Sequence, residues 1–468
     1  MAGNLYRNRV WTPATVSARD LSARSSGALT EERLGSAAAL VMVVWTFYSF
    51  KPEWTVPGLK VIAPLQTLSQ AALLLAWTFS ARKNLKNPVT LYFFLFLIVL
   101  TLSTALARNN GLGRDELRAM FFFYITYLAT ITFANTEKKL FTLFNLMLFG
   151  SLYLALLAIK GGGLIRGVAM FEDQNDMALN MNILWPIALF LGMGEKSKTR
   201  KAVYFAAVGV FITAVVISNS RGGLVGLLAV MFFVWLKLPV SKIKTTALVL
   251  AMVFAVTLFA PQSFWDKMST LQTEGLERGT SASRIFLWKV ALEEFADNPV
   301  IGVGARNFGV WLPEYVDNKV GFDRSAMSRE TTFYGRVCHS IYFTLLSETG
   351  ATGFLLFMLM VRQLFAAAGS DRHWARLALR IKNSKQGKGA EQDLLYRKTQ
   401  ACRTLSLGLT GGAIGLLTSG AFVTVLYYPQ FWLLCALGVL VGNCKNRLRD
   451  SAAKILSQEV ATCSSARP

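Results

Sequence analysis

Apolar stretches of about twenty residues recur along the 468-residue chain and are separated by short polar segments. A stretch of that length matches the hydrocarbon core of a bilayer when it forms a helix. The pattern therefore predicts an all-α, polytopic integral membrane protein with about twelve transmembrane helices. The predicted spans are 34–50, 61–80, 88–107, 117–134, 140–159, 177–194, 202–218, 222–238, 245–260, 341–365, 404–427 and 430–443.

The composition supports a membrane protein. Apolar residues make up 53% of the chain and charged residues only 16%, whereas soluble proteins carry about 25% charged residues. The net charge of +22 would favour a nucleic-acid partner if the basic residues formed a patch. They lie mainly in short loops between apolar runs, so we expect membrane lipids and no nucleic acid as partners.

The basic residues predict an orientation, because loops rich in Lys and Arg stay in the cytoplasm. Alternate loops carry them, for example 196–201 and 237–244, as does the long segment 366–403. The resulting organisation is a cytoplasmic tail (1–33), nine spans (34–260), a large outer loop (261–340), three spans (341–443) enclosing the basic loop 366–403, and a cytoplasmic tail (444–468). The composition of 1–33 also fits a transit peptide, although the first span can itself direct insertion.

The outer loop is expected to contain an amphipathic helix that ends before Pro299 and packs on, or lies at the surface of, the membrane domain. Its predicted apolar stripe is Ile285, Trp288, Leu292 and Phe295, with Lys289, Glu293, Glu294 and Asp297 elsewhere. The glycine-rich, aromatic stretch 300–315 that follows predicts an irregular loop. A second glycine-rich stretch, 408–420, predicts close packing of that span against its neighbours.

His339 is the principal candidate for chemistry. The chain has two histidines, and His373 lies in the basic loop, where a solvated role suffices. His339 falls at the junction of the outer loop and the tenth span, where a titratable group meets both water and a lipid-borne substrate. An imidazole can accept a proton from a hydroxyl at neutral pH. The alternative is an ordinary histidine at a helix N-terminus, satisfied by the backbone.

The residues around His339 form a recognisable motif. His339 and Ser340 are followed by nine residues, Gly350, two more residues and Gly353. This spacing resembles the H-[NSQ]-x9-G-x-x-[GTY] pattern of bacterial O-antigen ligases, whose superfamily also includes O-antigen polymerases and bacterial protein O-oligosaccharyltransferases. Segments 171–186, 218–223 and 283–309 are similar to the same superfamily, so the resemblance covers roughly residues 166–360.

The resemblance implies that a glycan moves from an undecaprenyl-diphosphate carrier to an acceptor hydroxyl, on lipid A-core for a ligase, at the periplasmic face of the inner membrane. A diphosphate is a good leaving group, so such a transfer needs an activated acceptor and stabilisation of the growing negative charge. We therefore expect inversion at the anomeric carbon, no cofactor and no metal site.

Arginines on the outer side are candidates for the diphosphate contact, because a guanidinium group pairs with phosphate oxygens and stays charged. Arg221, which is flanked by glycines that would let a ligand approach, is the first choice; it could instead snorkel at the membrane boundary. Arg284 is second, with a salt bridge to a nearby acid as the alternative. Arg166 and Arg306 are weaker substrate-binding candidates.

The remaining polar residues in these segments favour structural roles. Glu348 is out of helical phase with His339, so it is expected to hold a neighbouring helix or an arginine. Asp173 or Asn175 is expected to cap the sixth span, with sugar binding as the alternative. Cys338 is adjacent to His339 and would point about 100° away from it on a helix, which disfavours a Cys–His nucleophile.

Several functions fit the motif. Within the same chemistry, the acceptor could be a second lipid-linked repeat, as in a polymerase, or a protein hydroxyl. A lipid or solute transporter is the alternative outside enzymes, since about twelve spans with cytoplasmic termini is a common transporter layout. Transporters place their polar groups near the middle of the membrane, whereas the informative residues here gather at the outer ends of the spans.

Overall fold

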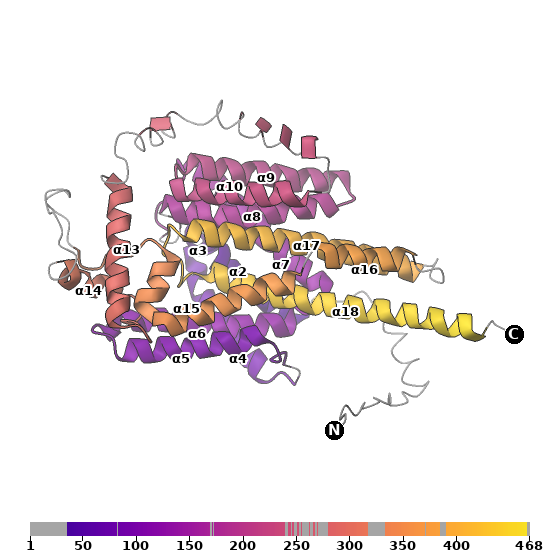
Figure 1. Cartoon of the computed structure of the whole chain (residues 1–468), viewed down its shortest axis with the longest axis horizontal. Helices are drawn as coiled ribbons and strands as arrows, with labels where there is room; N and C mark the ends of the chain where they lie inside the picture. The colour runs from indigo at the N-terminus through magenta and orange to yellow at the C-terminus, as the bar shows by residue number, and fades with distance from the viewer. Residues whose placement is uncertain are drawn as a thin grey trace, which may run out of the picture. The chain divides into compact units, whose positions relative to one another are not determined.

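The computed structural model describes residues 35–468 except 82, 169–170, 172, 317–332, 370, 384–389, 466–468 and most of 239–278. Every regular element in that part of the chain is a helix (Figure 1). The elements are α2 (Ser36–Phe50), α3 (Pro52–Thr55), η1 (Leu59–Ile62), α4 (Ala63–Thr78), α5 (Pro88–Ala105), α6 (Asn110–Phe133), α7 (Glu137–Lys160), α8 (Gln174–Gly194), α9 (Lys198–Ile217), α10 (Arg221–Lys237), α13 (Gly279–Asp297), α14 (Phe308–Tyr315), α15 (Ile341–Ala368), α16 (Asp371–Asn383), α17 (Ala390–Gly420) and α18 (Pro429–Ser465).

A helix lies at each predicted span except 245–260, most of which falls outside the described residues. Among the described residues, 6 helical segments are long and apolar enough to cross a membrane: Leu59–Thr78, Pro88–Ala105, Glu137–Lys160, Gln174–Gly194, Lys198–Ile217 and Ile341–Asn383. The all-helical membrane architecture is confirmed. The count of about twelve spans and the outer placement of 261–340 stay predictions.

The helices near the C-terminus do not coincide with the predicted spans. Helix α17 begins before the predicted span 404–427 and ends within it, at Gly420, α18 continues past the predicted span 430–443, and residues 421–428 form a turn between them. The described residues of the basic segment 366–403, predicted to connect two spans, are largely helical, in α16 and the start of α17. Hydropathy detects the apolar part of a helix, so it does not mark where a charged helix continues into water.

Helix α8 lies at the centre of one half of the bundle, beside α9, α10 and α17 (Figure 1). Glycines of α17 allow this packing: a Cβ at Gly412 would lie 2.7 Å from the Ile183 carbonyl oxygen, and one at Gly415 would lie 2.3 Å from that of Asn182. The predicted close packing of this stretch is therefore confirmed. Asn182 also donates hydrogen bonds to the Gly223 carbonyl (2.7 Å) and the Ser419 hydroxyl (3.0 Å), which join three helices.

Helix α15 is broken at Gly350, whose φ of 64° and ψ of −170° are not helical. The segment 299–304 fills the break with its backbone. The Val303 and Gly304 amides donate to the Ser347 and Glu348 carbonyls (2.8 and 3.1 Å), and the Ala351 amide donates to the Pro299 carbonyl (2.8 Å). The groups freed by the break are thus satisfied within the protein, as the interior of a membrane requires.

Of the two predicted placements of this amphipathic helix, α13 takes the packed one, because it contacts α15, but it buries a different face from the predicted one. The buried residues include Leu287, Val290, Ala291 and Glu294, whereas Leu292 of the predicted stripe is 46% exposed. The reason is that α13 packs on α14 and the Cys338 segment, which together form a separate apolar cluster. The stretch 300–315, predicted as an irregular loop, contains α14 in its second half.

Candidate active site

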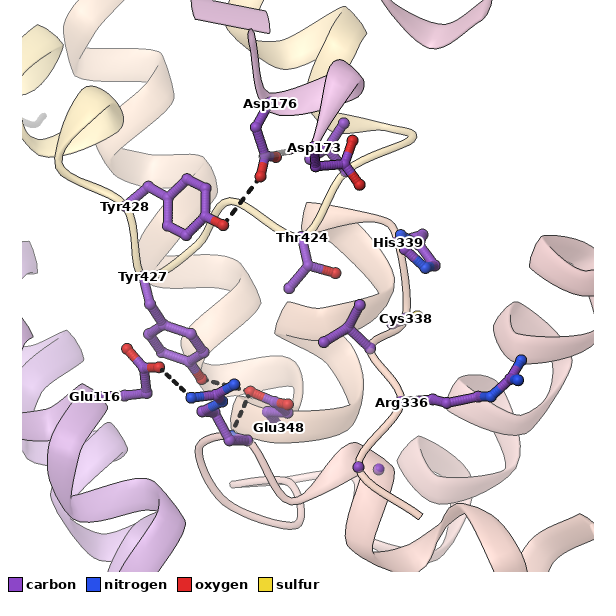
Figure 2. A pocket seen from close by; sticks show the side chains of 15 residues that line it. Glu116, Asp173, Asp176, Arg336, Cys338, His339, Glu348, Thr424, Tyr427 and Tyr428 are labelled. Atoms are coloured by element: carbon purple, nitrogen blue, oxygen red, sulfur yellow. Dashed lines mark hydrogen bonds and ion pairs between the residues drawn. The ribbon is translucent and has the colours of Figure 1, made fainter. Parts of the chain in front are cut away.

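A cavity of about 410 Å³ lies beside His339 (Figure 2). Its walls come from the start of α6, the start of α8, the segments 306–309 and 335–339, α15 and the turn after α17. The lining residues are Glu116, Asp173, Asp176, Arg306, Gly309, Gly335, Arg336, Val337, Cys338, His339, Glu348, Val423, Thr424, Tyr427 and Tyr428. Segments far apart in the sequence therefore converge on one polar cavity.

His339 has a strained backbone, with φ of 53° in the left-handed region. It immediately precedes Ser340, the N-cap residue of α15. Arg306, on the same cavity, has φ of 54°. A residue other than glycine in this conformation costs about 1–3 kcal/mol, and such residues cluster at functional sites. The turn before α15 thus holds the imidazole in a position that a relaxed helix start would not give it.

Burial is the main cause that holds the pKa of His339 below its ordinary value of 6.5. The positive charge of Arg284 lowers it further, Asp173 opposes the shift, and Arg336 contributes a smaller lowering. In Figure 2, His339 and Asp173 lie on one side of the cavity, opposite Glu116. The imidazole is therefore neutral at neutral pH and can accept a proton.

Neither Arg221 nor Arg284 is among the residues that line the cavity, but the charge of Arg284 acts on His339. Burial lowers the pKa of Arg284, Asp173 raises it, and the charge of Arg221 lowers it. Arg284, on α13, is thus coupled both to His339 and Asp173 and to Arg221, the first residue of α10. The positive charge of Arg284 therefore acts beside the neutral imidazole of His339.

The start of α10 is fixed to the start of α8. Ser220 caps α10 by accepting a hydrogen bond from the Gly223 amide (2.9 Å), and its hydroxyl donates to Asn175 Oδ1 (2.6 Å). The predicted role of the neighbouring glycines was wrong. A Cβ at Gly222 would lie 2.7 Å from Phe422, and one at Gly223 would lie 2.4 Å from the Ala178 Cβ, so both glycines serve helix packing.

The two weaker arginine candidates differ in position. Arg306 lines the cavity, and its guanidinium lies 3.3 Å from the Glu116 carboxylate. Arg166 is exposed in the turn between α7 and α8 and is not among the residues that line the cavities found in the described part of the chain. The structure therefore brings Arg306, and not Arg166, to the site.

Glu348 has a structural role, as the sequence predicted, but it binds the backbone of an arginine and a tyrosine from a turn. Its carboxylate accepts hydrogen bonds from the Arg306 amide (2.9 Å) and the Tyr427 hydroxyl (2.5 Å). Asp173 is the N-cap of α8 and accepts from the Asn175 amide at 2.6 Å, which confirms the capping role. Cys338 is buried in the apolar cluster with α13 and α14.

Sequence reasoning missed several residues of the cavity. Glu116 pairs with Arg306, Tyr428 donates a hydrogen bond to Asp176 Oδ2 (3.1 Å), and Arg336 lowers the pKa of His339. The sequence offered one usable signal, a charged residue next to an apolar run, as at Glu116. It did not indicate which residue would pair with that charge.

One family model matches part of the chain. Residues 206–358 match the family model described as O-antigen ligase. The predicted resemblance is therefore confirmed over this segment, which contains Arg221, Arg284, Arg306, His339 and Gly350. A comparison with curated proteins gave no match. The O-antigen ligase family implies a membrane enzyme of ligase or polymerase type that transfers a glycan between a lipid-linked donor and an acceptor.

Proposed function

We propose that this protein is an inverting, metal-independent glycosyltransferase of the O-antigen ligase type. It moves a glycan from undecaprenyl diphosphate to a hydroxyl of lipid A-core on the periplasmic face of the bacterial inner membrane. The observation that carries the proposal is the neutral, half-buried imidazole of His339, which faces a polar cavity and lies beside the positive charge of Arg284. The acceptor is taken from the family resemblance.

In the proposed reaction, His339 removes the proton from the acceptor hydroxyl as the oxygen attacks the anomeric carbon. The new bond is the glycosidic C–O bond, and the bond that breaks joins the anomeric carbon to the diphosphate. Undecaprenyl diphosphate leaves with the bonding electron pair, and the proton passes from the imidazole to solvent. Attack from the face opposite the leaving group inverts the anomeric centre.

Arg221 and Arg284 stabilise the negative charge that grows on the diphosphate. Guanidinium groups suit this task because they pair with phosphate oxygens in a planar, bidentate manner. The charge of Arg284 has a second effect, since after burial it is the largest cause that lowers the pKa of the imidazole. The same arginine therefore serves the leaving group and the base.

The direct test is reconstitution of the purified protein in liposomes with a lipid-linked glycan and lipid A-core. We expect transfer with inverted anomeric configuration, read by NMR of the product, and a rate that EDTA leaves unchanged. A retained configuration would contradict direct attack by the acceptor. Loss of transfer in EDTA, restored by Mg²⁺, would contradict the metal-independent mechanism.

The pH dependence of transfer is expected to follow the groups around His339. The base works only when neutral, so kcat/KM should fall as the pH drops below the pKa of His339, which lies below 6.5. This fall is the acid limb of the pH profile. Replacing Arg284 by glutamine removes a charge that lowers the pKa of His339, so the acid limb should move to higher pH. Asp173→Asn removes a charge that raises the pKa, so the limb should move to lower pH.

Arg166→Gln is the matched control, because this exposed arginine lies away from the cavity. The midpoint of the acid limb is the readout, since it is independent of a general loss of rate. An acid limb that keeps its position in both Arg284→Gln and Asp173→Asn would show that His339 is not the titrating group.

A further inference from the structure

A second cavity, of about 580 Å³, adjoins the first. The two share four lining residues: Glu116, Arg306, Tyr427 and Tyr428. These four therefore form a partition between the cavities. The rest of the second cavity comes from the end of α2, the residue that follows it, α4 and the first turns of α6.

The partition is built so that it can open. Its central contact is the 3.3 Å ion pair between Arg306 and Glu116, in which the arginine side chain is 53% exposed and the glutamate side chain 19% exposed. An ion pair with an accessible partner contributes little to stability, because water competes for the guanidinium group. The backbone of Arg306 is held separately, through the bond from its amide to Glu348. The guanidinium can thus swing aside while the cavity wall stays in place.

The second cavity carries cations that no ion pair compensates among the described residues. Lys51 and Arg118 line it, and no carboxylate is recorded within 4 Å of either. Glu53, the acid nearest to Lys51 in sequence, is buried, and its charge raises the pKa of Lys51. Asp115 also lines the cavity, and it is exposed to solvent, as Arg118 is. Three cations (Lys51, Arg118 and Arg306) and two acids (Asp115 and Glu116) line the cavity, so an anion that entered it would meet a small excess of positive charge.

Lys51 has a second unusual property. Its φ of 48° places it in the left-handed region, at the N-cap of α3. A lysine gains nothing intrinsic from that conformation, which costs about 1–3 kcal/mol. Burial also lowers the pKa of Lys51. The fold thus holds a partly desolvated ammonium group at the cavity at some cost, and an anionic ligand would offset the desolvation.

The other walls suit a sugar. Gln66 and Gln70 provide amide groups that can donate to and accept from hydroxyls, and Gln70 donates to the Tyr48 hydroxyl at 2.9 Å. Phe122 adds an aromatic ring, and the Arg118 guanidinium lies over it, 6.0 Å from the ring centre. The combination of amides and cations is the chemistry that recognises a sugar carrying an anionic group.

We propose that the second cavity binds the acceptor through a phosphorylated sugar, held by Lys51 and Arg118, with the Arg306–Glu116 pair as the gate toward His339. The inference rests on the proposed function and adds to it the site and the chemical class of the acceptor. The acceptor hydroxyl then reaches His339 through the first cavity, past Arg306. The donor diphosphate leaves on the other face of the anomeric carbon, toward Arg221 and Arg284, which lie outside the lining of that cavity.

The experiment measures binding without transfer, so that it does not depend on the reaction. The probe is the phosphorylated oligosaccharide released from lipid A-core by deacylation, and the comparison is the same oligosaccharide after phosphatase treatment. Binding to the purified protein in neutral-lipid nanodiscs is followed by calorimetry. We expect the wild type to bind the phosphorylated form at least about tenfold more tightly, and Lys51→Met and Arg118→Gln each to remove most of that preference.

Two controls match the variants. Arg114→Gln removes the same charge one turn earlier on α6, and Lys60→Met removes a lysine that stacks on Trp54; neither residue lines the cavity. Both should bind the probe as the wild type does. Equal binding of the two oligosaccharides by the wild type, or wild-type affinity in both cavity variants, would overturn the proposal. Nanodiscs of anionic lipid form a further arm: if they abolish probe binding, the cations hold a phospholipid headgroup and the proposal is wrong.

The result is distinguishable from a failure of the proposed function. Selective binding of the phosphorylated probe in a protein that forms no glycosidic bond would leave the cavity assignment intact and remove the enzyme assignment. Normal transfer and unchanged probe binding in Lys51→Met and Arg118→Gln would remove the cavity assignment and leave the enzyme assignment intact.

Discussion

Replacing His339 is expected to lower the rate of glycan transfer by about 10²–10⁴-fold, the usual contribution of a general base. Neither alanine nor asparagine can accept the acceptor proton, so the hydroxyl must attack without activation. The two replacements separate two effects. Asparagine tolerates the left-handed backbone of position 339, where φ is 53°, whereas alanine adds the cost of that conformation. Equal losses of rate in both would assign the effect to the imidazole.

His373→Asn is the control, because it removes the other histidine, on α16, away from the cavity. Membrane content and thermal stability of His339→Asn should match those of the wild type, since the side chain faces a cavity instead of a packed core. If His339→Asn retains a substantial part of the transfer rate, the imidazole is not the base, and the proposed mechanism is wrong.

The parts of the site that lie close together in sequence could be predicted from it. His339, Ser340, Gly350 and Gly353 occur within fifteen positions of one another, so their spacing alone carried the resemblance. The capping role of Asp173 is equally local, because a cap bonds to amides a few residues away. Long apolar runs located the helices for the same reason, although they did not locate the charged ends of α17 and α18.

The walls of the cavity could not be predicted, because they depend on which helices meet. Glu116, Asp176 and Tyr427 are single polar residues near apolar runs, and nothing in their own surroundings identifies their partners. Tyr427 donates to Glu348 across 79 positions. The prediction of which face of α13 is buried was wrong for a related reason. The apolar residues favoured the stripe that includes Leu292, but the packing against α14 decides which side of the helix is covered, and Glu294 lies on the buried side.

Gly350 shows both what the sequence could predict and what it could not. The motif located this glycine, but nothing in the sequence indicated its structural role. In the structure it opens helix α15, and segment 299–304 bonds to the exposed backbone on both sides of the break. Glu348, two positions earlier, then accepts the Arg306 amide. The glycine therefore connects the loop that carries Arg306 to the helix that begins next to His339.

Replacing Gly350 by alanine is expected to destabilise the protein by about 2–6 kcal/mol and to abolish transfer. The φ of 64° and ψ of −170° lie in a region that essentially only glycine occupies, at a cost of about 1–3 kcal/mol for other residues. The added Cβ would also lie 2.4 Å from the Val300 carbonyl carbon, and such overlap costs about 1–3 kcal/mol. Thermal unfolding in detergent and the transfer assay measure the two effects.

Gly58→Ala is the matched control. Gly58 also has a positive φ, of 82°, but nothing lies within 4 Å of its Cβ position, so this variant bears the backbone cost without the overlap. Gly302→Ala should behave like Gly350→Ala, because a Cβ there would lie 2.4 Å from the Glu348 carbonyl carbon on the other side of the same contact. If Gly350→Ala unfolds at the wild-type temperature and still transfers glycan, segment 299–304 does not depend on the break, and the positioning of Arg306 must have another origin.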